Sequence, residues 1–211
     1  QLGDIVFVEV PVEGRTLGNL TTLSFDFLRN SSSNVAGHLA PAFRLSYAQQ
    51  NAQTGAIESG YLIWENVYNG GSTSSAVATD VFKSNDILGG NFWMRAFGPG
   101  RTIEDFDVTL EQWASGYTTG SSHELSANTL ITGIEVGVGS GWGGTFSGAV
   151  DNVAVGFGLV TYRGRESMPN ESADLITANF EPDAIASVPE SSTWAMMIGG
   201  FGLVGGALRR R

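Results

Sequence analysis

Residues 23–27 read Leu-Ser-Phe-Asp-Phe, a run in which every second side chain is apolar. Successive side chains of a β-strand point to opposite faces of a sheet, so this alternation predicts a strand with one buried and one polar face. The same period returns at residues 43–47, 105–111 and 134–138. These runs indicate sheets that each cover one side of a hydrophobic core.

Other short apolar segments have the length of strands and lie between Gly-, Asn- and Ser-rich stretches. They occupy residues 4–12, 60–68, 91–97, 144–157 and 173–180. No stretch before residue 190 repeats apolar residues at helical spacing over three turns. We therefore expect an all-β fold, an antiparallel two-sheet β-sandwich of the jelly-roll kind, over residues 1–181.

Large aromatic side chains and polar loops complete this expectation. The aromatic residues that we expect to supply much of the buried area are Trp64, Phe92, Trp93, Trp113 and Trp142. Three polar segments are expected as surface loops, at residues 29–37, 69–79 and 163–172.

Composition excludes several classes of function. The chain has 211 residues, 42% of them hydrophobic, and a net charge of -10, which would repel phosphate backbones and so excludes nucleic acid as a partner. It has no cysteine, so disulfides, thiolate metal sites and cysteine nucleophiles are excluded. No Met opens the sequence, and we expect either a removed signal peptide or a fragment of a longer chain.

The sequence changes character after residue 181. Residues 182–187 are expected to form a linker, and residues 194–208 form an apolar run without a charged side chain. This run is shorter than the roughly 20 residues that span a bilayer core, but flanking residues and snorkelling arginines extend it. Arg209, Arg210 and Arg211 close the chain and would stay on the cytoplasmic side. A permanent anchor and a buried C-terminal helix are the alternatives to a sorting signal.

The order of these features resembles a PEP-CTERM sorting domain of the PEPxxWA type, at residues 188–211. The motif, at 188–195, contains Val188, Pro189, Glu190, Trp194 and Ala195, and Ser191 stands where the family usually has Pro. The resemblance implies a transmembrane helix at about 194–208 and processing by exosortase, a membrane-embedded sorting enzyme of Gram-negative bacteria that make extracellular polysaccharide. It also implies export, a precursor tethered transiently in the inner membrane, and final location at the cell surface or in the extracellular matrix.

Residues 141–158 resemble the last strands of concanavalin-like jelly rolls, where a Gly-aromatic turn leads into a Gly-x-Val-Asp-Asn-Val strand. Asp151 and Asn152 interrupt the apolar alternation of this segment. Such a pair can hydrogen-bond its own backbone at a bulge, bind calcium through oxygen ligands, or contact a ligand directly. The three interpretations remain open, with calcium as the one cofactor considered.

The search for catalytic residues predicts that the chain is not an enzyme. Asp105, Asp107 and Glu111 would share one face of a strand, but their spacing does not match the paired carboxylates of jelly-roll glycosidases. His38 and His123 lie in polar contexts without the spacing of a zinc site or a catalytic triad.

With the PEP-CTERM resemblance, the sequence is expected to encode an exported surface or matrix protein, and the resemblance implies association with exopolysaccharide or biofilm. The alternative is a lectin-like carbohydrate-binding module, which an aromatic strip or an Asp/Asn cluster on one sheet would support. Trp142 and Tyr117, each in a Gly-rich context, are the candidates for stacking on a sugar, and packing is the competing explanation. A glycoside hydrolase, the third alternative, requires two carboxylates that face each other in a groove.

Overall fold

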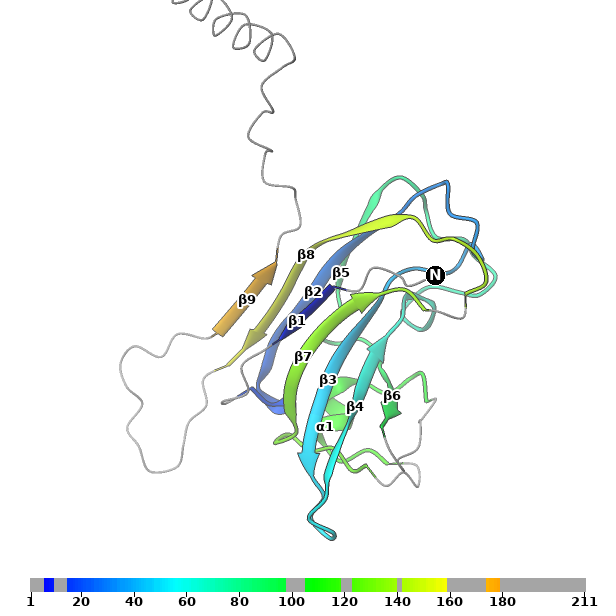
Figure 1. Cartoon of the computed structure of the whole chain (residues 1–211). Coiled ribbons are helices and arrows are strands. Elements are labelled where there is room, and N and C mark those ends of the chain that lie inside the picture. Colours follow the sequence, from blue (N-terminus) through cyan, green and yellow to red (C-terminus); the bar gives the residue numbers. More distant parts are fainter. Residues whose placement is uncertain are drawn as a thin grey trace, which may run out of the picture. The chain divides into compact units, whose positions relative to one another are not determined.

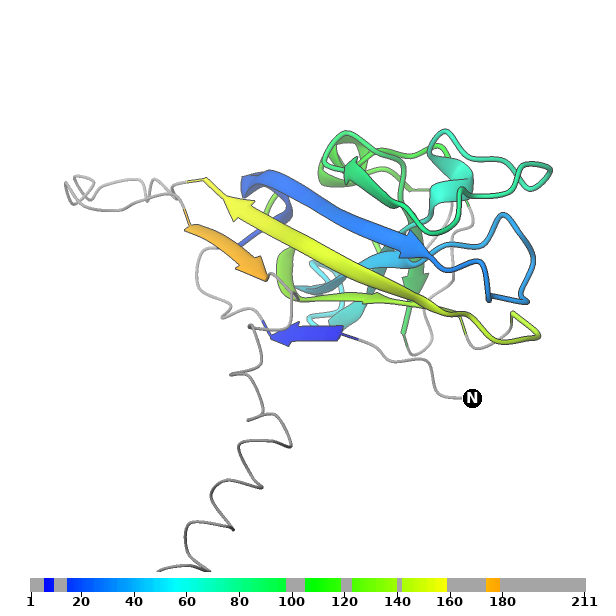
Figure 2. The same cartoon turned by 90° about the horizontal axis from the view of Figure 1, so that it is seen from above.

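The computed structural model describes residues 6–9, 15–97, 105–118, 123–139, 142–158 and 174–178. Within them the chain forms nine strands that pair in two antiparallel sheets (Figures 1 and 2). The first sheet has five strands, in the order β1 (Val6–Glu9), β7 (Leu130–Gly137), β3 (Ala42–Gln50), β4 (Ile57–Trp64) and β6 (Trp93–Ala96). The second has four strands, in the order β5 (Phe82–Asp86), β2 (Leu20–Arg29), β8 (Gly148–Phe157) and β9 (Asp174–Ala178).

The hydrophobic core lies between the two sheets. Leu23, Phe25 and Phe27 of β2 are at most 1% exposed, as the alternation at residues 23–27 predicts. The ring of Phe25 lies 5.4 Å from that of Phe43 on β3 and 5.4 Å from that of Trp64 on β4, centroid to centroid. These contacts join the sheets, so the predicted all-β sandwich is confirmed.

The predicted strand at residues 105–111 is wrong. Residues 106–107 form a turn, and α1 (Leu110–Ala114) follows. Thr109 begins this helix with a capping box, because its hydroxyl accepts from the Gln112 backbone while the Gln112 side chain accepts from the Thr109 backbone. Leu110 and Trp113, one helical turn apart, are both buried in the core. The three acidic residues of this segment therefore do not line one strand face.

Other expectations are corrected at single elements. Strand β5 has no apolar alternation, and its sequence did not predict it. Trp64, Phe92 and Trp113 are buried, but Trp93 and Trp142 are only half-buried, so their assignment to the core was wrong. The loops expected at residues 29–37 and 69–79 are present, connecting β2 to β3 and preceding β5. Two single-turn 3-10 helices, Leu17–Asn19 and Asn66–Tyr68, complete the described elements.

The C-terminal segment is a separate unit. Contacts along the chain divide it into Gln1–Asn179 and Phe180–Arg211. The expected linker, the sorting motif, the apolar run and the arginine cluster all lie outside the described residues, as does the loop expected at 163–172. In the described part of the chain, no helix is long and apolar enough to cross a membrane.

Candidate functional site

The outer face of the five-stranded sheet carries aromatic and charged side chains. Strand registers place them in two rows that cross the sheet from β7 through β3 and β4 to β6. The first row is Glu135, Arg44, Ile63 and Trp93, and the second is Gly133, Ser46, Tyr61 and Arg95. The residues between them in each strand, such as Leu45, Leu62 and Met94, belong to the core, so the two rows point away from it.

An ion pair occupies the middle of this face. Arg44 Nη1 donates to Glu135 Oε1 across the β3–β7 pair, and Glu135 is only 6% exposed. The hydroxyl of Tyr61 also hydrogen-bonds Glu135, and the Arg44 guanidinium lies 5.9 Å from the Tyr61 ring centroid. Burial, followed by the charge of Glu135, raises the pKa of Tyr61 above its usual value. The phenol therefore remains a neutral hydrogen-bonding group at physiological pH.

A second carboxylate lies beside this pair at the end of β4. Glu65 Oε2 accepts a hydrogen bond of 3.0 Å from Trp93 Nε1. Burial raises the pKa of Glu65, although the Trp93 hydrogen bond and the charge of Arg44 oppose the increase. Glu65 thus fixes the orientation of the indole on the neighbouring strand, as a buried acceptor does.

Five aromatic rings form two groups here, and we call them together the aromatic strip: Tyr61 of β4 with Phe97 just after β6, and Trp93 of β6 with Phe106 and Tyr68. The Tyr61 and Phe97 rings meet edge to face, with centroids 4.8 Å apart. Phe106 stacks on Tyr68 at 4.0 Å and contacts Trp93 edge to face at 6.2 Å. Phe97 is 42% exposed and the other four are half-buried, so the strip remains accessible to solvent.

The combination of aromatic rings with arginine and carboxylate groups on one sheet face has the chemistry of a carbohydrate-binding surface. Aromatic rings fixed by neighbours offer flat apolar surfaces at low cost in side-chain entropy, while arginine and carboxylate groups supply directional hydrogen bonds. A sugar ring presents an apolar face of C–H groups and a rim of hydroxyls, which needs both kinds of partner. The outer face of the five-stranded sheet is therefore our candidate functional site.

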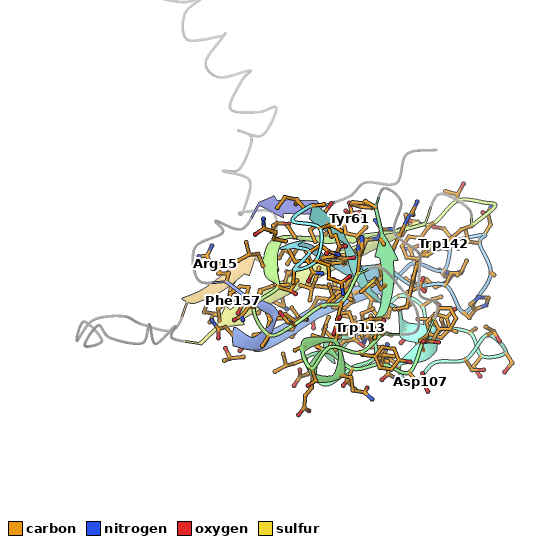
Figure 3. The ribbon with its side chains drawn as sticks, turned by 90° about the horizontal axis from the view of Figure 1, so that it is seen from below. Arg15, Tyr61, Asp107, Trp113, Trp142 and Phe157 are labelled. Atoms are coloured by element: carbon orange, nitrogen blue, oxygen red, sulfur yellow. The ribbon has the colours of Figure 1, made fainter. Side chains whose placement is uncertain are left out.

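The residues that the sequence singled out for sugar stacking lie elsewhere. Figure 3 shows Tyr61 and Trp142 in different parts of the sandwich, with Trp142 in the loop before β8. The Trp142 ring packs edge to face on Phe146, 5.7 Å between centroids. Tyr117 packs on Trp113, and its hydroxyl donates to Asp105 Oδ2 at 2.9 Å, which raises the pKa of Tyr117. The structure therefore does not bring Trp142 and Tyr117 to the aromatic strip.

Asp151 and Asn152 form an irregularity in the four-stranded sheet. The β2–β8 register shifts between Ser24 and Asp26, and Asn152 has a φ of 49°, which describes a β-bulge. The Asn152 backbone N–H donates to Asp151 Oδ1 at 2.7 Å, and its side-chain amide donates to Asp26 Oδ2 at 2.8 Å. This is the local backbone bonding expected of the pair, and calcium binding by Asp151 and Asn152 stays a prediction. Among the described residues, no three His, Cys, Asp or Glu side chains gather as a metal site would require.

The two histidines have different environments. His38 is half-buried in the loop before β3, whereas His123 is 2% exposed and its Nδ1 lies 2.8 Å from the Tyr47 hydroxyl. Burial, followed by the charge of Glu58, raises the pKa of Tyr47. His123 and Tyr47 thus form a hydrogen-bonded pair inside the sandwich.

A polar groove of about 910 Å³ lies beside the β3–β4 hairpin. Two of its lining residues are the acids Glu58 and Glu124. Glu58 accepts hydrogen bonds from Gln49 at 2.9 Å and from Asn51 at 2.6 Å, so neighbouring amides hold both of its oxygens. The groove therefore presents amides and carboxylates rather than aromatic rings.

The sequence contains one signal for the outer face, in the residues that flank buried positions of β4 and β6. Tyr61 precedes the buried Leu62, and Trp93 and Arg95 flank the buried Met94. Large aromatic residues at the polar positions of an alternating strand indicate a binding surface. Because aromatic residues are also typical of protein cores, residue type alone does not distinguish the two. Comparison of the chain with protein-family models, curated proteins and solved structures finds no match.

Proposed function

We propose that the chain is an exported bacterial surface or matrix protein whose sandwich binds polysaccharide on the outer face of the five-stranded sheet. The observation that carries this proposal is the placement of Tyr61, Phe97 and Trp93 beside the Arg44–Glu135 ion pair on one sheet face. The rings would stack on sugar rings, and the arginine guanidinium groups of this face would donate hydrogen bonds to hydroxyls. A polymer suits the site, because the two groups of rings, at Tyr61 and at Trp93, would contact separate sugar units.

The finer fold and the cellular location belong to the same proposal. The two antiparallel sheets support a concanavalin-like jelly roll, and the sequence at residues 141–158 resembles its last strands. Export is supported by the order of motif, apolar run and arginines at residues 188–211, which resembles a PEP-CTERM signal. Exosortase would be the processing partner, with transient residence in the inner membrane.

Binding rather than catalysis is the function that the site favours. Arg44 pairs with Glu135, which is 6% exposed, so this carboxylate is committed to structure. A retaining glycosidase needs a second carboxyl group with access to the anomeric carbon. Glu65 is instead occupied as the acceptor for Trp93.

The sugar-binding part is tested with the full chain in mild detergent on a glycan array, with and without calcium. Tyr61→Ala and Trp93→Ala are each expected to weaken polysaccharide binding about tenfold or more, because each removes a stacking surface. Thr22→Ala and Ser24→Ala, on the outer face of the other sheet, are the matched controls and should bind normally. Undiminished binding by both aromatic variants would exclude this face as the site.

The sorting part is tested by expression with a signal peptide in hosts with and without exosortase. We expect intact mass to show loss of the residues after about 190 only where the enzyme is present. A chain that keeps its C-terminus in both hosts would argue for a permanent anchor, and recovery in the cytoplasm would contradict export.

A further inference from the structure

We propose that the polysaccharide is acidic, a polymer with uronic acid units, and that Arg95 binds its carboxylates. This inference rests on the proposed function and specifies its ligand class. Arg95 pairs with Tyr61 in the β4–β6 register, and the pKa of Tyr61 responds to its positive charge. Phe97, two residues further along the chain, contacts the Tyr61 ring. The guanidinium therefore lies beside the stacking surface.

Arg95 differs from the other cations of the described residues, which all have partners inside the protein. Arg44 pairs with Glu135, and Arg29 donates to two backbone carbonyls at 2.8 and 2.9 Å. Lys83 donates to an asparagine side chain at 2.5 Å, and Arg15 lies over an aromatic ring. Arg95 is exposed, and no described side chain forms an ion pair or accepts a hydrogen bond from it.

Charge complementarity selects the ligand. The Arg44–Glu135 pair is neutral as a unit and Glu65 accepts a hydrogen bond from Trp93, so no side chain among the described residues forms an ion pair with Arg95. A chain of net charge -10 gains nothing from general attraction to an anionic polymer, so an acidic ligand needs a local cation. A guanidinium binds a carboxylate through two parallel hydrogen bonds, which favours a carboxylate over a hydroxyl.

The geometry also distinguishes acidic sugars from other polyanions. Nucleic acids and anionic membranes bind through many cations at once, whereas the described residues of this face offer one guanidinium without an ion-pair partner, Arg95, beside several rings. A polyuronate matches both features of the face, since each of its units has a sugar ring that can stack on an aromatic ring and a carboxylate that can bind a guanidinium. One sugar on Tyr61 would then place a carboxylate within reach of Arg95.

The test uses the full chain in mild detergent and two polyuronates, namely polygalacturonate and alginate, each with its carboxyl-reduced neutral form. We expect at least one acidic polymer to bind tenfold or more tightly than its reduced form, and this preference to fall as salt is added. Arg95→Gln should abolish the preference while Arg95→Lys keeps part of it. Lys83→Gln removes the same charge from β5 of the other sheet and should change nothing.

The outcomes separate the two proposals. Equal binding of acidic and reduced polymers, with loss on Tyr61→Ala, would overturn the acidic ligand and keep the polysaccharide site. An acidic preference that survives Arg95→Gln would overturn the role of Arg95. Failure to bind any glycan would overturn both proposals. Single-stranded DNA bound as tightly as the best polyuronate would mean a general anion site and would also overturn the inference.

Discussion

The two outer faces of the sandwich differ although the two inner faces are alike. The centre of the four-stranded sheet presents small or acidic side chains, such as Thr22, Ser24, Asp26 and Ala154. The outward positions on β3, β4 and β6 of the five-stranded sheet instead carry Tyr61, Trp93 and two arginines. Because folding requires only a polar outer position, large rings and guanidinium groups there are not explained by the core. The comparison supports the proposal that the outer face of the five-stranded sheet is the binding face.

The core shared by both faces gives the largest expected effect. Phe25→Ala removes a fully buried ring that contacts both Phe43 and Trp64 across the sheets, and should lower the free energy of unfolding by about 3–5 kcal/mol. Ser24→Ala, the neighbouring outward residue, should change it by less than about 0.5 kcal/mol. Urea denaturation measures both. Similar losses for the two variants would contradict the assignment of inner and outer faces.

An intermediate effect is expected at the bulge of the four-stranded face. Asn152 has a φ of 49°, where a side chain with a Cβ is disfavoured unless it is Asn or Asp. Asn152→Ala should therefore be about 1 kcal/mol less stable than Asn152→Gly. Both variants lose the hydrogen bond to Asp26, so their difference isolates the backbone conformation. Equal stability of the two in thermal denaturation would mean that the bulge relaxes.

The smallest effect concerns the pH dependence of Glu65 on the five-stranded face. Its pKa in the folded chain is raised from the ordinary 4.5, chiefly by burial, so the folded state holds the proton more tightly than the unfolded state. The resulting contribution to stability is complete below about pH 4.5 and is lost as pH rises through the raised pKa. Glu65→Gln keeps the acceptor for Trp93 but does not titrate.

We therefore expect wild type to lose stability relative to Glu65→Gln between about pH 4 and about pH 7. Denaturation of both proteins at the two pH values measures the difference. A constant difference would mean that the Glu65 carboxyl is as well solvated folded as unfolded, and an increase in relative stability with pH would reverse the sign of the shift.

Much of the fold could be predicted because alternation is a direct consequence of strand geometry. Residues 23–27 and 43–47 place each apolar side chain on one face, and the structure buries those side chains. Residues 105–111 alternate as well, but the capping pair Thr109 and Gln112 favours a helix start over a strand. Strand β5 has one buried side chain and forms through pairing with β2, which no local pattern reveals.

The candidate site was harder to predict than the fold. The ion pair between Arg44 and Glu135 joins residues that are 91 positions apart, and it depends on which strands become neighbours. Hydrophobic periodicity shows which face a residue occupies, but it does not show strand order. Trp93 illustrates the result: it was assigned to the core by residue type, and the structure places it on the outer face.

The short outermost strands limit how the sheets of neighbouring molecules can pair with each other. In the described part of the chain, the outermost strands β1, β6, β5 and β9 have four or five residues, whereas the strands between them have eight to ten. A short edge strand exposes few unpaired backbone N–H and C=O groups to another molecule. Under the proposed function, copies held close together on one polymer would therefore have little strand edge through which their sheets could merge into fibrils.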